Sequence, residues 1–300
     1  MESQCLGAAE ALSAHPIIKR VHLKSPWRQL SPWLRFGHEY ALTPDSDPIG
    51  PPYPDLIIAS GRKSIGVALH IKKKSDGKTF LVQLQDPRID PKNFDLVVVS
   101  EHDPARGENV IVTTGALHRV TPQKIAAEKA KFATKLEPLP QPRVAVLIGG
   151  NSQVHRMTPE ITKKLAQQLL ELKTSLMVTA SRRTGPENEA ILRDMLKGPN
   201  VYFWDGKGDN PYFALLGYAD YIVATEDSVS MVSEALSTGK PVLIAPLEGG
   251  SKRFQRFHQM LQEQGLTKPF TGLLKMWSYT PLQDTIKVTD EIRRRMKMKE

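Results

Sequence analysis

The chain has 300 residues, of which 40% are hydrophobic and 24% are charged, a composition typical of a globular protein with about two domains. The formal net charge of +9 divides into +4 over residues 1–142 and +5 over residues 143–300, which argues against the concentrated basic patch of a nucleic-acid-binding protein. Cys5 is the single cysteine, so the sequence excludes an intrachain disulfide and a thiolate zinc site, and no apolar run is long enough to span a membrane. We therefore expect a cytoplasmic protein in a reducing compartment, with no metal site and no nucleic-acid partner.

The stretch "KSPWRQLSPWLRFG" (24–37) mixes aromatic and basic residues. Trp27 and Trp33 stand among Lys24, Arg28 and Arg35, a pattern that suits a membrane interface or a lipid-linked acceptor. The alternative is a loop that covers the first sheet with two buried tryptophans. Either interpretation is compatible with a peripheral protein on the cytosolic face of a membrane.

Nearly continuous apolar runs then alternate with helical patterns through the first half of the chain. Runs of this kind are typical of strands covered on both faces, and they predict strands over 55–60, 79–85, 94–100 and 109–115. Ligands of open α/β sheets bind outside the carboxyl ends of the strands, so the residues that follow each strand are the candidates for a site. On the acceptor side these are Ser60, Gly61, Arg62, Arg88 and His118, with Asp86 and His102 as candidate general bases.

Each of these candidates also has a structural interpretation. An Asp-Pro turn with an internal contact between Asp86 and Arg88 accounts for the first pair, and a lone histidine after a strand is more often structural. Both interpretations stay open at this point.

The stretch "KLEPLPQPR" (135–143) has the composition of a linker, and a second series of strands follows it. Residues 143–150, 175–181, 200–206, 221–227 and 241–246 are the predicted strands, and Thr158 caps a predicted helix over 158–173. We expect an α/β chain of two Rossmann-like parallel-sheet domains that face a cleft. Residues 1–140 form the N-terminal domain, on the acceptor or partner side, and residues 141–300 form the nucleotide-sugar domain with a C-terminal helix.

Three loops of the second domain could bind phosphate. The first contains Gly149, Gly150, Asn151 and Ser152, and its glycines either let a phosphate approach the backbone or form a tight strand-to-helix turn. The second contains Ser181, Arg182 and Arg183, and arginines bind phosphate oxygens bidentately unless they are simply solvated.

The third loop is the start of a helix in "IVATEDSVSMVSEALSTGKPVLIAP" (222–246). The free amides and positive dipole of a helix beginning near Ser228 to Ser230 attract anions, and a carboxylate at Glu234 could accept both hydroxyls of a ribose. A capped helix with a solvated glutamate is the alternative.

The stretch "SVSMVSEALSTGKPVLIAP" resembles the donor motif of two-domain (GT-B) glycosyltransferases. That resemblance implies that Ser228, Ser230, the amide of Met231 and Glu234 bind a UDP-type nucleotide-diphosphate sugar, and that Arg256 lies near the sugar. The stretches "SGRKSIGVA", "QDPR", "GALHRV", "IGGNS", "TASRRTG" and "DNPYFALLGYADYIVATEDSVSMVSEA", in this order, resemble the mitochondrial fission (elongated-mitochondria) protein family. This family is expected to have a GT-B-like fold.

Members of this family usually begin with a strand and a glycine-containing loop, where this sequence has Met1. We therefore expect the first sheet to lack its first strand. Three hypotheses remain open: a metal-independent glycosyltransferase, a non-catalytic membrane-surface adaptor in organelle or cell-envelope morphology, and a nucleotide-sugar epimerase.

Overall fold

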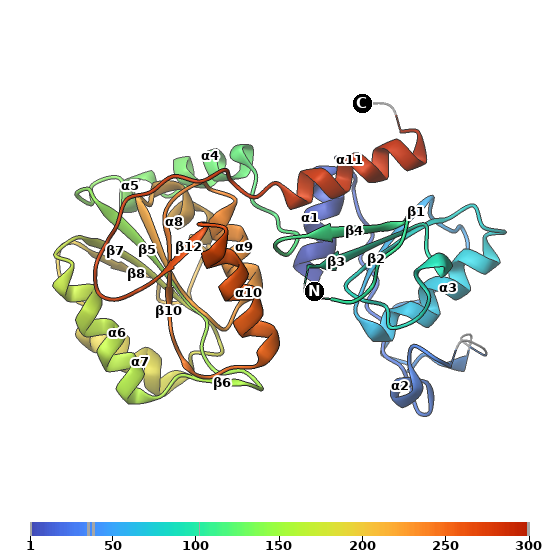
Figure 1. Cartoon of the computed structure of the whole chain (residues 1–300), viewed down its shortest axis with the longest axis horizontal. Coiled ribbons are helices and arrows are strands. Elements are labelled where there is room, and N and C mark those ends of the chain that lie inside the picture. Colours follow the sequence, from blue (N-terminus) through green and yellow to red (C-terminus); the bar gives the residue numbers. More distant parts are fainter. Residues whose placement is uncertain (1, 35–36, 38–39, 102, 299–300) are drawn as a thin grey trace. The chain divides into compact units, whose positions relative to one another are not determined.

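The computed structural model describes residues 2–34, 37, 40–101 and 103–298. The chain divides into two compact units, one made of residues 1–119 and 283–300 and the other of residues 120–282 (Figure 1). No helix in these described ranges is long and apolar enough to cross a membrane.

Unit 1 contains a parallel four-stranded sheet whose strand order, β1-β2-β3-β4, follows the sequence. Its strands are β1 (Leu56–Ser60), β2 (Phe80–Leu84), β3 (Leu96–Ser100) and β4 (Val110–Thr113). Its helices are α1 (Glu2–Ala11), α2 (Trp27–Leu30), α3 (Ile65–Lys74) and α11 (Asp284–Met296), with short 3-10 helices η2 (Arg62–Ser64) and η3 (Pro91–Asn93).

The sheet of unit 1 has an apolar core on each face. On one face Val82 and Val98 pack with Ala8 of α1 and with Val288 and Ile292 of α11. On the other face the core is built around α3 and is lined by Leu81, Val97, Val99, Ile65 and Ala68. Because successive side chains of a strand point to opposite faces, the continuous apolar runs of the sequence fill both cores.

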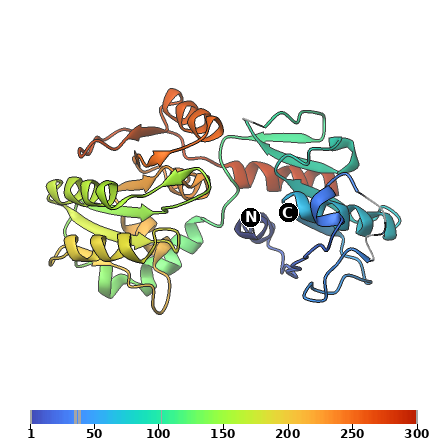
Figure 2. The ribbon, with the colours of Figure 1, turned by 90° about the horizontal axis from the view of Figure 1, so that it is seen from below.

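Helix α11 belongs to unit 1, although the sequence predicted a C-terminal helix of the second domain. The Asp284 carboxylate accepts hydrogen bonds from the amides of Thr114 (3.3 Å) and Gly115 (2.7 Å), which places the start of the helix beside the end of β4. At its other end the Arg293 guanidinium donates to the carbonyl of Ala11. Figure 2 shows α11 running along the sheet of unit 1.

Unit 2 contains a parallel six-stranded sheet with the order β12-β10-β9-β5-β7-β8. Its strands are β5 (Arg143–Ile148), β7 (Ser175–Ala180), β8 (Val201–Phe203), β9 (Tyr221–Thr225), β10 (Val242–Ala245) and β12 (Thr267–Pro269), and β6 (His155–Arg156) pairs separately with β11 (Glu248–Gly249). Its helices are α4 (Pro122–Lys131), α5 (Ala133–Leu136), α6 (Pro159–Glu171), α7 (Pro186–Met195), α8 (Tyr212–Tyr218), α9 (Val229–Leu236) and α10 (Lys252–Glu263).

Helices cover both faces of the six-stranded sheet. Within β5, Ala145 and Leu147 pack toward α4, α5 and α8, whereas Val146 and Ile148 pack toward α6 and α7 (Figure 1). The prediction of an α/β chain with two parallel sheets is therefore confirmed.

The structure also locates the boundary between the units nearer the N-terminus than the predicted linker. Helix α4 lies before that linker but packs on α8 of unit 2. The Tyr218 hydroxyl donates to the carbonyl of Lys129, and a Cβ added to Gly217 would lie 2.9 Å from Ile125. Residues 120–142 thus belong to unit 2, and the proline-rich stretch is a turn within that unit.

Candidate functional site

The candidate site lies where the strand order of the six-stranded parallel sheet reverses, between β5 and β9. From β5 the sheet grows through β7 and β8 on one side and through β9, β10 and β12 on the other. The loops that follow β5 and β9 therefore leave the carboxyl edge of two neighbouring strands in different directions, and this is the position where open α/β sheets bind ligands. The four described strands of unit 1 run in sequence order and contain no such reversal.

Hydrogen bonds join the three predicted phosphate loops at this edge. The Gly149 amide donates to the hydroxyl of Thr225 (2.8 Å), and the Gly149 carbonyl accepts from the hydroxyls of Ser181 (2.6 Å) and Thr184 (2.8 Å). The Asn151 amide donates to the carbonyl of Arg183 (2.8 Å). The loops after β5, β7 and β9 thus form one connected cluster.

The glycine loop is occupied by contacts within the protein. The Ser152 amide donates to the carbonyl of His155, and the Ser152 hydroxyl accepts from the amide of that residue. A Cβ on Gly149 would overlap the Asp227 carboxylate, and one on Gly150 would overlap the Arg183 carbonyl. Both glycines are buried and are required by close packing, so the structure favours the interpretation of a tight turn here.

The two arginines after β7 have different environments. The Arg183 guanidinium forms a 2.8 Å ion pair with Asp227, whose side chain is 0% exposed. The other Asp227 oxygen accepts from the Thr225 hydroxyl (2.6 Å), so this carboxylate ties the loops after β7 and β9 together. Arg182 is exposed and forms no ion pair with any residue that the structure describes. Of the two, Arg182 is the arginine whose guanidinium is not engaged by Asp227.

Helix α9 begins at this edge, a few residues after the end of β9. The Ser228 hydroxyl accepts from the Met231 amide (3.3 Å), as expected of a capping serine, so the Met231 amide is already engaged. Within the described residues, the amides of Val229 and Ser230 have no hydrogen-bond partner. Two orphan amides at the positive end of the helix dipole make this the most favourable position for an anion in the cluster.

Glu234 lies along α9 and is held by a buried phenol of α8. The Tyr212 hydroxyl donates to the Glu234 carboxylate at 2.6 Å. Burial, followed by the charge of Glu234, raises the pKa of Tyr212, so the phenol remains a donor throughout the physiological range. This contact orients a half-buried carboxylate beside the start of α9.

Three further polar side chains lie beside these loops, and sequence reasoning missed two of them, Glu226 and His155. The His258 ring of α10 lies with Nε2 2.8 Å from the Glu226 carbonyl, and burial lowers the pKa of His258 below its usual value. The Glu226 carboxylate accepts from the Leu247 amide, and His155 packs edge-on against Phe254. The order "EDSVS" places Glu226 and Asp227 directly after β9, but only the strand order shows that they meet α10 and the glycine loop.

The predicted residues of unit 1 do not form a comparable cluster. The Asp86 carboxylate accepts from the Arg88 amide (2.9 Å), which is the contact of the alternative Asp-Pro turn, made here with the backbone. His118 is 5% exposed within the core of the unit, whereas Arg62 is exposed on η2. Gly61 precedes η2 with φ +88°, Ser60 ends β1, and His102 lies outside the described residues.

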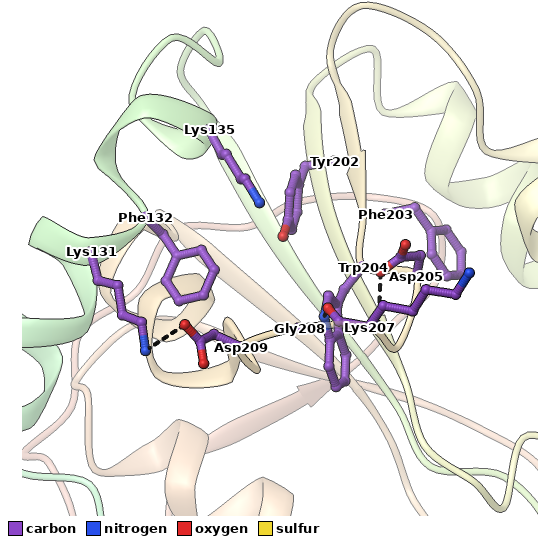
Figure 3. A pocket seen from close by; sticks show the side chains of 10 residues that line it. All are labelled: Lys131, Phe132, Lys135, Tyr202, Phe203, Trp204, Asp205, Lys207, Gly208 and Asp209. Carbon is purple, nitrogen blue, oxygen red and sulfur yellow. Dashed lines mark hydrogen bonds and ion pairs between the residues drawn. The ribbon is translucent and has the colours of Figure 1, made fainter.

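Arg256 is exposed on α10, one turn after the start of that helix. A separate pocket of about 430 Å³ lies beside β8 and the junction of α4 and α5, and none of the predicted site residues lines it. Figure 3 shows the aromatic rings of this pocket, Phe132, Tyr202, Phe203 and Trp204, and the ion pair between Lys131 and Asp209.

Comparison with known proteins identifies the family. A sequence profile described as "Mitochondrial fission ELM1" matches residues 1–296, which is almost the whole chain. The chain belongs to the mitochondrial fission ELM1 family.

Relatives of this ELM1-family chain include a plant and a bacterial protein. The mitochondrial fission protein ELM1 of Arabidopsis thaliana is 32% identical in an alignment of 274 residues that covers 81% of this chain and 64% of the plant protein. The chain thus spans less than two thirds of the length of that relative. The uncharacterized protein RP120 of Rickettsia prowazekii is 28% identical over 288 residues, with 82% of this chain and 80% of the relative covered.

Solved structures similar to the ELM1-family chain include nucleotide-sugar enzymes of GT-B-like architecture. The UDP-GlcNAc 2-epimerase of Methanocaldococcus jannaschii has a TM-score of 0.48 and 14% identity, covering 82% of this chain and 71% of its own. MurG of Acinetobacter baumannii has a TM-score of 0.43 and 12% identity, with coverages of 81% and 67%. Both scores are below 0.5, so neither similarity assigns a ligand or an activity to this chain.

Proposed function

We propose that unit 2 of this ELM1-family protein binds a UDP-type nucleotide-diphosphate sugar at the start of α9. The observation that carries the proposal is the position of this helix start at the reversal point of the six-stranded sheet, with the amides of Val229 and Ser230 unpaired among the described residues. The diphosphate would accept hydrogen bonds from these amides and from the Ser230 hydroxyl, and Arg182 would approach it from the loop after β7.

Glu234 would bind the ribose of the nucleotide. Its carboxylate is already oriented by the Tyr212 hydroxyl, so binding does not have to order this side chain. A carboxylate in this relation to a phosphate-binding helix start can accept from both ribose hydroxyls, as acidic residues do in dinucleotide folds.

Transfer of the sugar without a bound cation is the reaction that such a site supports. The positive end of α9 and the Arg182 guanidinium would stabilise the negative charge that develops on the leaving diphosphate. The acceptor and the group that deprotonates it stay outside this proposal, because Asp86 is engaged in a turn and His118 is buried.

Calorimetric titration of the protein with UDP and with UDP-GlcNAc tests the proposal. We expect saturable binding that Ser230→Asp weakens by roughly tenfold or more, because the new carboxylate places negative charge where the diphosphate should lie. Glu234→Ala should weaken binding of UDP but leave the weak binding of inorganic pyrophosphate unchanged, because pyrophosphate has no ribose.

A matched control is Ser13→Asp, which makes the same change of charge at an exposed position of unit 1. It should leave the affinity for UDP unaltered. Equal affinities of the wild type and Ser230→Asp for UDP would remove α9 from the site, and no binding of any nucleotide by the folded protein would reject the proposal as a whole.

The second candidate function is a non-catalytic adaptor that acts as a peripheral protein at the cytosolic face of a membrane. The pairing of Arg183 with Asp227 favours it, because one of the two predicted phosphate-binding arginines stabilises the fold instead. The turn at Asp86 favours it as well. An adaptor predicts that Glu234→Ala leaves the biological activity of the protein intact, whereas a transferase predicts that this change abolishes it.

A further inference from the structure

Two stretches of unit 1 contain many basic residues and no acidic ones. Residues 11–38 include five Lys or Arg and no Asp or Glu, and residues 56–75 include another five, again with no Asp or Glu. Together these stretches carry a charge of +10, compared with the net charge of +9 of the whole chain. The net charge is divided almost evenly between the two halves of the sequence, so a comparison of the halves does not reveal these two basic stretches.

The structure brings the two stretches together. The Ser31 hydroxyl donates to the carbonyl of Arg62 at 2.7 Å, so the segment that follows α2 lies against η2. Ser31 and Pro32 are buried at this contact. Lys24, Arg28, Arg62 and Lys63 are exposed around it, and none of these four side chains forms an ion pair with a described residue.

Two large apolar side chains project outward from the same segment. The Trp33 amide donates to the carbonyl of Leu30 (2.9 Å), which closes a turn over residues 30–33 directly after α2. Leu30 is 49% exposed and Trp33 is 59% exposed, whereas the partly buried Trp27 packs against the small core of this region. The sequence left open whether the tryptophans of this stretch are buried or reach a membrane. In the structure Trp27 packs against a core and Trp33 is exposed.

We propose that this surface, defined by Leu30, Trp33, Lys24, Arg28, Arg62 and Lys63, binds the anionic surface of a lipid bilayer. Leu30 and Trp33 enter the boundary between head groups and acyl chains, and the four basic side chains contact lipid phosphates and carboxylates. A bilayer fits this surface better than a nucleic acid or an acidic protein, because an exposed leucine beside an interfacial tryptophan contributes little to binding a polyanion. The surface lies in unit 1, so the inference does not depend on nucleotide binding by unit 2.

The test is co-sedimentation of the full chain with vesicles. One set is made of phosphatidylcholine alone, and in the other about a third of the lipid is phosphatidylserine. We expect binding to the second set only, and we expect it to weaken as the ionic strength rises from about 0.05 M to about 0.5 M. Soluble glycerophosphoserine should not compete, because a free head group lacks the acyl boundary that Leu30 and Trp33 require.

Two variants separate the charged and the apolar contributions. Arg28→Glu/Lys63→Glu should lower the partition coefficient by about 25-fold or more, since each basic side chain near an anionic surface contributes about fivefold. Leu30→Ser/Trp33→Ser should also reduce binding, and the residual binding should depend more strongly on salt. In the wild type we expect a blue shift of tryptophan emission on binding, which Trp33→Phe removes while binding is retained.

Matched controls lie in unit 2. Lys163→Glu/Lys164→Glu makes the same change of charge at exposed positions of α6, and Leu273→Ser/Met276→Ser removes apolar side chains that are 62% and 69% exposed. Both controls should bind vesicles as the wild type does. The proposal is overturned if the wild type ignores anionic vesicles, if the controls lose as much binding as the test variants, or if the surface variants alter retention on heparin but not binding to vesicles.

Discussion

At the scale of single residues, the neighbouring Arg182 and Arg183 have different roles, since Arg183 forms an ion pair within the fold and Arg182 is proposed to contact a ligand. Both follow β7, and both suit a phosphate by their chemistry. The fully buried Asp227 forms an ion pair with Arg183, whereas Arg182 has no ion pair with any described residue. A carboxylate buried without its cation is costly, so Arg183 is tied to stability whether or not it also approaches a ligand.

The two arginines should therefore respond differently to substitution. We expect Arg183→Ala to lower the free energy of unfolding by about 1–3 kcal/mol, a value moderated because Arg183 is 42% exposed and water reaches the pair. Arg182→Ala should leave stability within about 0.5 kcal/mol of the wild type and weaken UDP binding. Urea denaturation and calorimetry of both variants check this, and the reverse assignment would refute it.

His258 makes the stability of unit 2 depend on pH. Its pKa in the folded protein lies below the usual value, chiefly through burial, so the unfolded chain binds more protons as pH falls below about 6.5. The contribution of this group to stability is therefore present above that pH and is lost on acidification. The groups that face the ring are Glu226, Asp227 and His155, and the carboxylate charges act against the effect of burial.

We expect His258→Gln to reduce the loss of stability between about pH 7.5 and about pH 5.5, because the amide can donate to the Glu226 carbonyl but does not titrate. Urea denaturation at several pH values measures the difference between the two proteins. If the free energies of unfolding of the two proteins differ by the same amount at every pH in that range, His258 keeps its ordinary pKa in the folded state.

The candidate site could be predicted from the sequence only in part. The Ser228 cap and the start of α9 follow from local residue types, so they were predicted correctly from residue patterns. The contacts of Gly149 with Asp227 and of Glu234 with Tyr212 join segments that are far apart in the sequence. They depend on which strands are neighbours, and no local pattern encodes that order.

At the scale of elements, the position of α11 is another feature that the local sequence pattern does not encode. Its amphipathic pattern predicts a helix, but the pattern does not state which sheet the apolar face covers. The apolar runs predicted every strand of the two main sheets except β12, whose three residues include a proline at its end. The boundary predicted from the three prolines of residues 135–143 differs from the boundary between the units, because prolines mark turns within domains as well as linkers between them.

The docking of α11 can be measured with two isoleucines of the same helix. Ile292 is 0% exposed in the core of unit 1, and Ile286 is 52% exposed. We expect Ile292→Ala to destabilise unit 1 by about 2–5 kcal/mol, whereas Ile286→Ala should change its stability by less than about 0.5 kcal/mol. Hydrogen exchange of the amides of β2 and β3 reports the stability of this unit. Equal protection in the two variants would contradict the packing of α11.

At the scale of the whole molecule, one unit is continuous in sequence and the other is not. Unit 2 is residues 120–282, whereas unit 1 combines residues 1–119 with residues 283–300. We expect a fragment of residues 120–282 to unfold cooperatively by itself. A fragment of residues 1–119 should show cooperative unfolding only when a peptide of residues 283–300 is added.

Circular dichroism during thermal unfolding of both fragments, with and without the peptide, is the measurement. A scrambled peptide of the same composition is the control. Cooperative unfolding of residues 1–119 without the peptide would show that unit 1 folds without α11.

This discontinuity has a consequence for synthesis on the ribosome. Residues 283–300 are translated after all of unit 2, so β1–β4 leave the exit tunnel long before α11 can cover them. During that interval one apolar face of the nascent sheet, which includes Val82 and Val98, has no α11 to shield it. An apolar surface of the nascent chain therefore stays exposed to solvent while the ribosome synthesises unit 2. We expect chaperones that bind nascent polypeptides to bind the first half of this chain.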